Sequence, residues 1–91
     1  MEYRILGRTG LRVSAVALGC EGFIHKTTEE VCADFDFAIA HGVNFVDIYS
    51  PNPELRTNIG AALEGRRGDF IIQGHLCTTW ENGQYLRTRD P

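Results

Sequence analysis

The 91-residue chain lacks the features that define several large classes of protein. Its longest apolar run, residues 13–18, is interrupted by Ser14 and is far shorter than the ~20 residues of a membrane-spanning helix. No apolar core of a secretory signal peptide follows the first residues. A net charge of -3 at pH 7 argues against binding to a phosphate backbone. We therefore expect a cytoplasmic protein with neither a membrane nor a nucleic acid among its partners.

Cysteine and lysine are scarce, and each scarcity excludes some chemistry. The 3 cysteines, Cys20, Cys32 and Cys77, are odd in number and form no Cys-x-x-Cys pair. Small secreted domains are usually held by several disulfides, so a reducing compartment is expected. Lys26 is the only lysine, so any mechanism that needs a lysine must use that residue. The sequence also has no Gly-x-Gly-x-x-Gly motif, which argues against a dinucleotide-binding loop of the Rossmann type.

Short strands and helices are predicted to alternate from the amino terminus. Residues 3–13 are typical of a β-hairpin, because two apolar runs flank a turn that contains two glycines. The small apolar run at residues 15–20 predicts a strand buried on both faces. Thr27 and Glu30 form a capping box at the start of a helix. Gly42 stands where the helix should end in a left-handed cap.

The same alternation continues in the second half of the chain. Residues 43–49 and 70–74 predict two further strands, and Pro53 marks the first position of the helix between them. Strand–helix–strand order at this spacing indicates right-handed βαβ units and a parallel sheet. Residues 77–85 are predicted to be a loop, and a helix is expected to begin within residues 87–91.

Polar and reactive side chains gather where each predicted strand ends, which is the functional edge of parallel α/β folds. Asp47 follows two apolar residues in its strand, where a carboxylate is costly unless it has a partner. His75 can act as an acid, or as the partner of Tyr49 or Asp47. The phenol of Tyr49 needs a nearby cation to act as an acid at neutral pH.

Structural roles are the alternatives for each of these residues. Asp47 could cap a helix or loop, and His75 could be a hydrogen-bonded histidine without a role in catalysis. Tyr49 could be a packing or rim residue. Cys20, Cys77 and His75, together with Asp47, could form a metal or redox site, but their spacing is not diagnostic of one. We therefore predict no metal. Trp80 and Tyr85 could line the mouth of a substrate site.

The order of motifs resembles the amino-terminal part of the aldo-keto reductase family. The most characteristic motif is the sequence Gly-Val-Asn-Phe-Val-Asp, which ends at Asp47 and is similar to the strand that bears the family's catalytic aspartate. The full set of matching segments is residues 3–14, 16–20, 42–47, 59–63, 66–67 and 70–72. Residues 73–76 and 80–85 resemble most closely a subgroup that commonly carries a ferredoxin-like iron–sulfur segment at its C-terminal end. The cysteines of this chain do not supply such a cluster.

The resemblance implies NADPH-dependent reduction of small aldehydes and ketones by a tetrad of aspartate, tyrosine, lysine and histidine. Asp47 matches the aspartate, whereas Asn52 stands at the tyrosine position and His75 at the lysine position. We therefore predict Asp47, His75 and Tyr49 as the catalytic residues. Gly19, Cys20 and Asp47 are the predicted contacts to the nicotinamide end of the cofactor. The family's other cofactor contacts and its tetrad histidine would lie beyond residue 91.

We accordingly predict an α/β fold in a single domain, residues 1–91. It consists of an N-terminal β-hairpin plus three β/α units of an incomplete (β/α)8 TIM barrel. A closed barrel takes about 250 residues, so we expect a truncated copy that is inactive alone. An uncovered parallel sheet would favour self-association. The alternative function is a non-catalytic association module that uses the open edge of this sheet.

Overall fold

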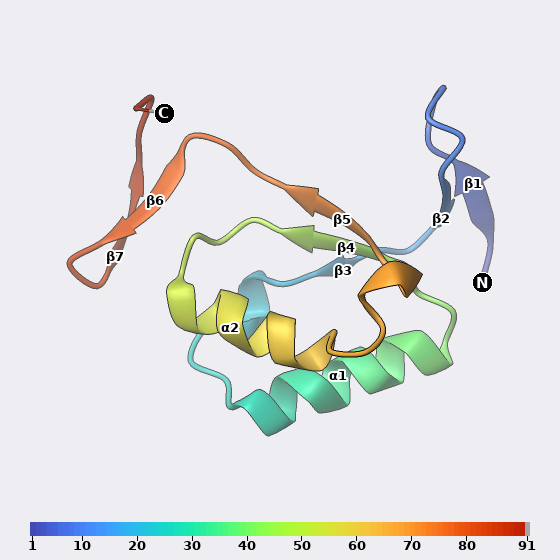
Figure 1. Ribbon diagram of the computed structural model, residues 1–91, viewed down its shortest axis with the longest axis horizontal. Helices are drawn as coiled ribbons and strands as arrows, with labels where there is room; N and C mark the ends of the chain where they lie inside the picture. The colour runs from blue at the N-terminus through green and yellow to red at the C-terminus, as the bar shows by residue number, and fades with distance from the viewer. Residues whose placement is uncertain (91) are drawn as a thin grey trace.

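The computed structural model describes residues 1–90, and it has the predicted α/β architecture with a parallel sheet (Figure 1). The central sheet has the strand order β3-β4-β5 and is parallel throughout. Its strands are β3 (Leu18–Gly19), β4 (Phe45–Ile48) and β5 (Ile71–Gly74), and its helices are α1 (Thr28–Ala40) and α2 (Pro53–Ala62). Short 3-10 turns, η1 (Glu21–Phe23) and η2 (Arg67–Asp69), lie in the connections.

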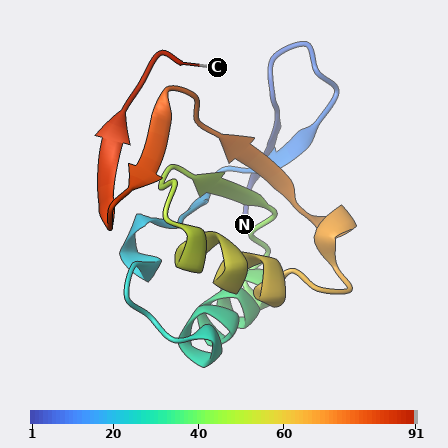
Figure 2. The ribbon, with the colours of Figure 1, turned by 60° about the vertical axis from the view of Figure 1, so that its left-hand side comes forward.

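Both helices cover one face of the sheet, as Figures 1 and 2 show. Successive side chains of a strand point to opposite faces. Val46 is buried in the core with the helices and Ile48 packs against it, so Asp47 points to the other face. In residues 1–90 no helix covers that second face. The sheet therefore has a core side and an open side, and Asp47 belongs to the open side.

The hydrophobic core lies between the sheet and the two helices and centres on Phe35. The Phe35 side chain is fully buried, and its ring packs between Phe23 and Phe70 with centroid distances of 5.8 and 5.9 Å. The remaining core residues are Cys20, Val31, Val46, Leu55, Ile59, Ala62 and Leu63. The apolar face of each helix thus packs against the same side of the sheet. Neither helix in residues 1–90 has the length and apolarity needed to cross a bilayer.

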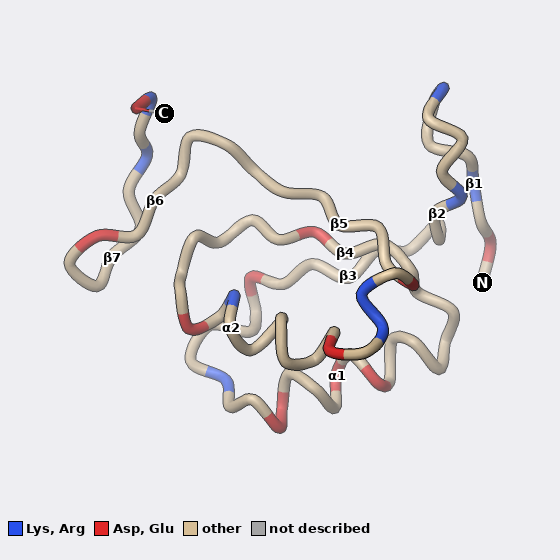
Figure 3. Tube along the Cα trace, in the orientation of Figure 1, with Lys and Arg blue, Asp and Glu red and all other residues tan. Residues whose placement is uncertain are grey.

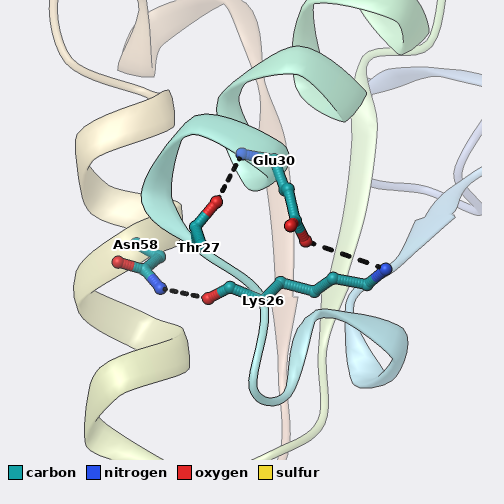
Figure 4. A network of polar contacts seen from close by, with 4 residues as sticks. All are labelled: Lys26, Thr27, Glu30 and Asn58. Atoms are coloured by element: carbon teal, nitrogen blue, oxygen red, sulfur yellow. Dashed lines mark hydrogen bonds and ion pairs between the residues drawn. The ribbon is translucent and has the colours of Figure 1, made fainter.

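The start of α1 confirms one half of the predicted capping box (Figure 4). The hydroxyl of Thr27 accepts a hydrogen bond from the backbone N–H of Glu30 at 3.1 Å. The Glu30 carboxylate does not return to the Thr27 backbone; it lies 3.8 Å from the ammonium of Lys26. Asn58 of α2 donates to the carbonyl of Lys26 at 3.3 Å, which ties the two helices together. The single lysine therefore has a structural contact at the surface.

The first hairpin closes the amino-terminal end of the sheet. It is formed by β1 (Tyr3–Ile5) and β2 (Arg12–Ser14), which pair antiparallel as predicted. The side chain of Asn44 accepts from the Ser14 N–H at 2.7 Å and donates to the Arg12 carbonyl at 2.9 Å. This amide fastens the hairpin to the residue that precedes β4. The carboxyl ends of the sheet strands lie at the opposite end (Figure 1).

Two of the predicted elements differ from the structure. The strand predicted over residues 15–20 is limited to Leu18–Gly19, and Val16 is 61% exposed. Only Leu18 and Gly19 find partners for pairing in β4, so the apolar residues before them stay outside the sheet. The predicted loop over residues 77–85 is instead a second hairpin, built from β6 (Thr78–Glu81) and β7 (Gln84–Arg87). Its turn residues Asn82 and Gly83 have φ values of 51° and 76°.

Two consecutive positive φ angles are the geometry of a type I′ turn, for which Asn-Gly is the preferred sequence. The prediction was wrong because the flanking strands are polar and show no clear apolar alternation. Arg87 lies in β7 and not in the expected helix, while Pro91 lies outside the described residues. The hairpin stands beyond the carboxyl ends of the sheet strands (Figure 1).

Candidate active site

The candidate site is centred on a contact between the ends of β4 and β5. Nε2 of His75 lies 2.7 Å from Oδ1 of Asp47, and their side chains are 30% and 34% exposed. Asp47 is the only charged residue within β3, β4 and β5 (Figure 3). A carboxylate can only accept a hydrogen bond, so Nε2 carries the proton of the imidazole. The pair thus fixes the tautomer of His75 and gives Asp47 the partner that its position in an apolar strand requires.

Tyr49 connects this pair to the second hairpin. Its ring meets the His75 ring edge to face, with centroids 4.9 Å apart and planes at 83°. On its other side the Tyr49 ring stacks with Tyr85 of β7 at 5.8 Å. The two phenol oxygens are 2.6 Å apart. Asp47, His75, Tyr49 and Tyr85 therefore form a continuous chain of contacts from the sheet to the hairpin, which we call the tyrosine–histidine cluster.

The two phenols have unequal acidities. The pKa of Tyr49 is raised, chiefly because its hydroxyl hydrogen-bonds with Tyr85. The pKa of Tyr85 is lowered, first by the hydrogen bond with Tyr49 and then by the neighbouring guanidinium of Arg87. Partial burial and the carboxylate of Glu21 oppose this lowering. Either phenol can donate the hydrogen bond that joins them.

Two cavities lie against the tyrosine pair, and both tyrosines line each of them. The first has a volume of about 250 Å³, and the second has a volume of about 280 Å³. Glu21, Ile24, Ser50 and Trp80 complete the first, whereas Leu76, Cys77, Thr78 and Arg87 complete the second. The hydroxyl oxygen of Thr78 is buried and has no hydrogen-bond partner among the described residues. The cavities have the size of a small metabolite and both apolar and polar walls.

The structure brings together the three predicted catalytic residues, Asp47, His75 and Tyr49. Of the predicted cofactor contacts, Gly19 pairs with Asp47 in the sheet register and is exposed. Cys20 differs from this expectation, because its side chain is 1% exposed and belongs to the hydrophobic core. Burial, and secondarily the charge of Asp47, raise the pKa of its thiol to about 12.

The predicted alternative was a metal site, and residues 1–90 do not bring its candidate ligands together. Cys20 is in the core, whereas Cys77 is exposed at the start of the second hairpin. Residues 1–90 contain no group of three or more histidine, cysteine or acidic side chains that could hold an ion. Asn52, at the position where the resemblance places a tyrosine, is buried and accepts a hydrogen bond from the N–H of Leu55 at 2.9 Å. Its side chain therefore caps α2.

Sequence reasoning missed part of this site. Arg87 was not predicted as a site residue, and Tyr85 was predicted only to line a substrate mouth. The available signal was the Asn-Gly dipeptide at residues 82–83, which predicts a hairpin with Trp80 opposite Tyr85. In this hairpin Tyr85 contacts Tyr49, which follows β4 directly.

These features define an α/β fold whose candidate site lies at the carboxyl ends of parallel strands. Similar proteins indicate the class to which it belongs. No family model matches the chain. It is 29% identical over 85 residues to the uncharacterized oxidoreductase YqkF of Bacillus subtilis (strain 168), over 91% of this chain and 28% of the relative.

Two solved structures of a candidate aldo-keto reductase from Pseudomonas aeruginosa, one of them named PA4992, match with TM-scores of 0.80 and 0.81. Both are 26% identical to this chain and match 93% of it. The chain spans 28% of YqkF and 34% of the Pseudomonas chains, so it is about a third of their length. The resemblance to aldo-keto reductases in fold and sequence is confirmed, and the oxidoreductase class is supported. The iron–sulfur subgroup stays a prediction.

Proposed function

We propose that this chain supplies the carbonyl-facing part of an oxidoreductase that reduces small aldehydes or ketones with NADPH. The observation that supports this function is the Asp47–His75 pair, 2.7 Å apart at the carboxyl ends of adjacent parallel strands. Reacting groups of barrels and related α/β folds lie at that edge. The similarity to an oxidoreductase and to aldo-keto reductase structures supports the class of reaction.

The open side of the sheet fits the nicotinamide end of the cofactor. Gly19 is beside Asp47 in the register, and apart from its chain neighbours no residue of the described chain lies within 4 Å of the place where a Cβ of Gly19 would stand. Glycine permits close approach of a ligand to the backbone, which suits a flat ring next to a carboxylate. Gly19 and Asp47 would hold this end, and the bound cofactor would supply a hydride. Cys20 supports the site from the core, where its N–H donates to the Asp47 carbonyl at 3.1 Å.

His75 is proposed to contact the substrate, and Asp47 is its positioning residue. With Nε2–H held by Asp47, the other ring nitrogen, Nδ1, takes no hydrogen bond from the described residues. When the ring is protonated, Nδ1–H can donate to a carbonyl oxygen and stabilise the negative charge that develops there. Tyr49 packs edge-on against the ring and keeps it in this orientation.

A fusion protein provides the test of this function. Residues 1–90 replace the matching third of PA4992, and NADPH oxidation is followed with aliphatic and aromatic aldehydes. We expect aldehyde-dependent turnover, and a decrease of about 100-fold or more in kcat/KM for His75→Gln. His25→Gln, which changes an exposed histidine outside the cluster, serves as the matched control. A folded fusion that binds NADPH but reduces no carbonyl compound would overturn the proposal.

Self-association is the second candidate function, and the open edge of β5 favours it. Only one side of β5 pairs with another strand of the described chain, and Leu76, just after it, is 89% exposed. Sedimentation velocity of the 91-residue chain, compared with a Leu76→Glu variant, tests this candidate. A concentration-dependent oligomer that the variant dissociates would support an association module. A monomer at all concentrations would rule it out.

A further inference from the structure

We propose that the substrate is an aldehyde that carries a carboxylate, an oxo acid, and that Arg87 and Arg89 bind its carboxylate. The inference rests on the proposed carbonyl reduction and names its substrate class. The binding surface leads from the tyrosine pair along the end of the second hairpin. We call this surface the arginine groove.

The arginine groove consists of two neighbouring cavities. The first is the cavity of about 280 Å³ that Tyr49 and Tyr85 line. The second has a volume of about 350 Å³ and is lined by Cys77, Arg87, Thr88 and Arg89. Because Cys77 and Arg87 line both cavities, the two are adjacent. A ligand in the groove can therefore contact the tyrosine pair at one end and both arginines at the other.

Arg87 and Arg89 are exposed and have no acidic partner. The ion pairs within residues 1–90 include neither of them. A guanidinium keeps its charge at all relevant pH values and binds a carboxylate through two parallel N–H···O bonds. In a chain with a net charge of -3, two unpaired arginines beside one cavity form a local site for an anion.

Strand pairing places Arg87 next to polar groups of the groove. Alternate residues of a strand project to the same face, so Tyr85 and Arg87 share one face of β7. Thr78 stands opposite Arg87 in the register and lines the same cavity. Its buried hydroxyl has no hydrogen-bond partner among the described residues, which costs free energy. A carboxylate held by Arg87 would give this hydroxyl an acceptor.

The spacing along β7 and the neighbouring charges define the size and orientation of the ligand. Two residues of a strand span about 7 Å, which is the separation of Tyr85 and Arg87 along β7. A carbonyl group and a carboxylate joined by a short alkyl chain fit this spacing. Glu21 lines the other cavity beside the tyrosine pair and would repel an anion there. The carboxylate is therefore directed to Arg87, and the carbonyl group to Tyr49, whose ring contacts His75.

The carboxylate takes no part in the bond changes of the reaction. The aldehyde carbon gains a hydride from NADPH, its oxygen gains a proton from water, and NADP⁺ remains. The product is a hydroxy acid with the same carboxylate. Substrate and product should therefore both bind the arginines, so binding can be measured with the product alone and without cofactor.

The first test measures binding to the 91-residue chain by NMR, with 4-hydroxybutanoate as the probe and 1-butanol as the ligand that lacks the carboxylate. We expect only the acid to cause saturable shifts of the Arg87 Nε–H signal, and we expect about 0.5 M NaCl to weaken them. Arg87→Gln should reduce the affinity about tenfold or more. Arg8→Gln removes an exposed arginine of the first hairpin and serves as the matched control, with unchanged affinity.

The second test compares two aldehydes in the PA4992 fusion, 4-oxobutanoate and butanal, which differ in the carboxylate. We expect kcat/KM to favour 4-oxobutanoate about tenfold or more, and we expect Arg87→Gln to reduce this ratio to about one. Arg87→Lys keeps the charge but loses the planar fork, so it should retain part of the preference. Arg8→Gln should leave the ratio unchanged. Far-ultraviolet circular dichroism shows whether each variant is folded.

The outcomes separate this proposal from the proposed function. An active fusion with equal kcat/KM for the two aldehydes, or a probe whose binding does not depend on Arg87, overturns the carboxylate site alone. A higher KM for NADPH in Arg87→Gln with an unchanged aldehyde ratio would assign the arginines to a cofactor phosphate and also overturn it. A fusion that reduces no carbonyl compound, but binds 4-hydroxybutanoate through Arg87, overturns the proposed function and supports the anion site. Loss of both the binding and the preference in Arg87→Gln supports both proposals.

Discussion

Nε2 of His75 lies 2.7 Å from Oδ1 of Asp47, and this contact joins the ends of two neighbouring parallel strands. The two side chains come from positions 28 residues apart in the sequence. The resemblance to aldo-keto reductases implies a lysine where this chain has His75. An imidazole has two ring nitrogens, whereas a lysine has a single ammonium group. The exchange therefore places Nε2 against Asp47 and leaves Nδ1 for a second partner.

The tautomer of His75 follows from this contact and can be measured. We expect the neutral ring to carry its proton on Nε2, because a carboxylate only accepts. His41 gives an internal contrast, since its Nδ1 lies 2.8 Å from the Phe37 carbonyl and should carry the proton. Long-range ¹H–¹⁵N correlation spectra distinguish the two forms. Asp47→Ala should alter the His75 pattern only; an unchanged His75 pattern would argue against the pair.

Two phenylalanines of α1 should differ widely in their contribution to stability. Phe35 is fully buried between two other rings, so Phe35→Ala should cost about 3–5 kcal/mol of unfolding free energy. Phe37 is 68% exposed and stacks only on His41, so Phe37→Ala should change it by about 0.5 kcal/mol or less. Urea unfolding followed by circular dichroism measures both. Equal effects of the two variants would contradict the position of the core.

The thiol of Cys20 should make stability depend on pH in the alkaline range. Burial and the charge of Asp47 raise its pKa from 9.0 to about 12 in the folded chain. Between these values the folded thiol keeps a proton that the unfolded thiol has lost. The unfolding free energy therefore falls as the pH rises above 9 and levels off near 12.

Urea unfolding between pH 7 and pH 10.5 tests this dependence, with Cys20→Ala as the control. We expect a steeper loss of stability in the parent chain than in the variant. A thiol reagent at pH 8 should modify the exposed Cys77 and spare Cys20. Parallel curves for the two chains would mean that the thiol does not contribute to the pH dependence.

The turn of the second hairpin should control the acidity of Tyr85. Gly83 has a φ of 76°, and an alanine there costs about 1–2 kcal/mol because its Cβ approaches the carbonyl oxygen. We expect Gly83→Ala to loosen the hairpin, so that the pKa of Tyr85, followed by ultraviolet titration of the phenols, rises toward its ordinary value. Gly68→Ala is the matched control, since Gly68 has no positive φ and free space around it. The idea fails if Gly83→Ala leaves the titration unaltered.

The parallel sheet and its helices could be predicted because their signals are local. Thr27 and Pro53 mark the first turns of the helices, and Gly42 ends α1 with a φ of 85°. The apolar strands between these markers then have only the βαβ arrangement open to them. Strand lengths were less predictable, because pairing partners decide them.

The site was only partly predictable, because some of its contacts join residues that are distant in the sequence. Asp47 and His75 could be placed at one edge from the order of strands alone. The hydrogen bond between Tyr49 and Tyr85 joins residues 36 positions apart and depends on the orientation of the second hairpin relative to the sheet. No periodic pattern in the sequence reports that direction. The contact between Tyr49 and Tyr85 therefore became visible only with the structure.

Asn52 caps α2 with its side chain, whereas the second hairpin carries Tyr85 to its contact with Tyr49. The second hairpin contributes no residue to the hydrophobic core. It begins just after Cys77, where a φ of 66° turns the backbone away from β5. Changes in the sequence of the hairpin should therefore alter the two cavities beside Tyr49, while the core between the sheet and the helices keeps its packing. The hairpin is consequently the segment in which library design can vary the candidate site at little cost in stability.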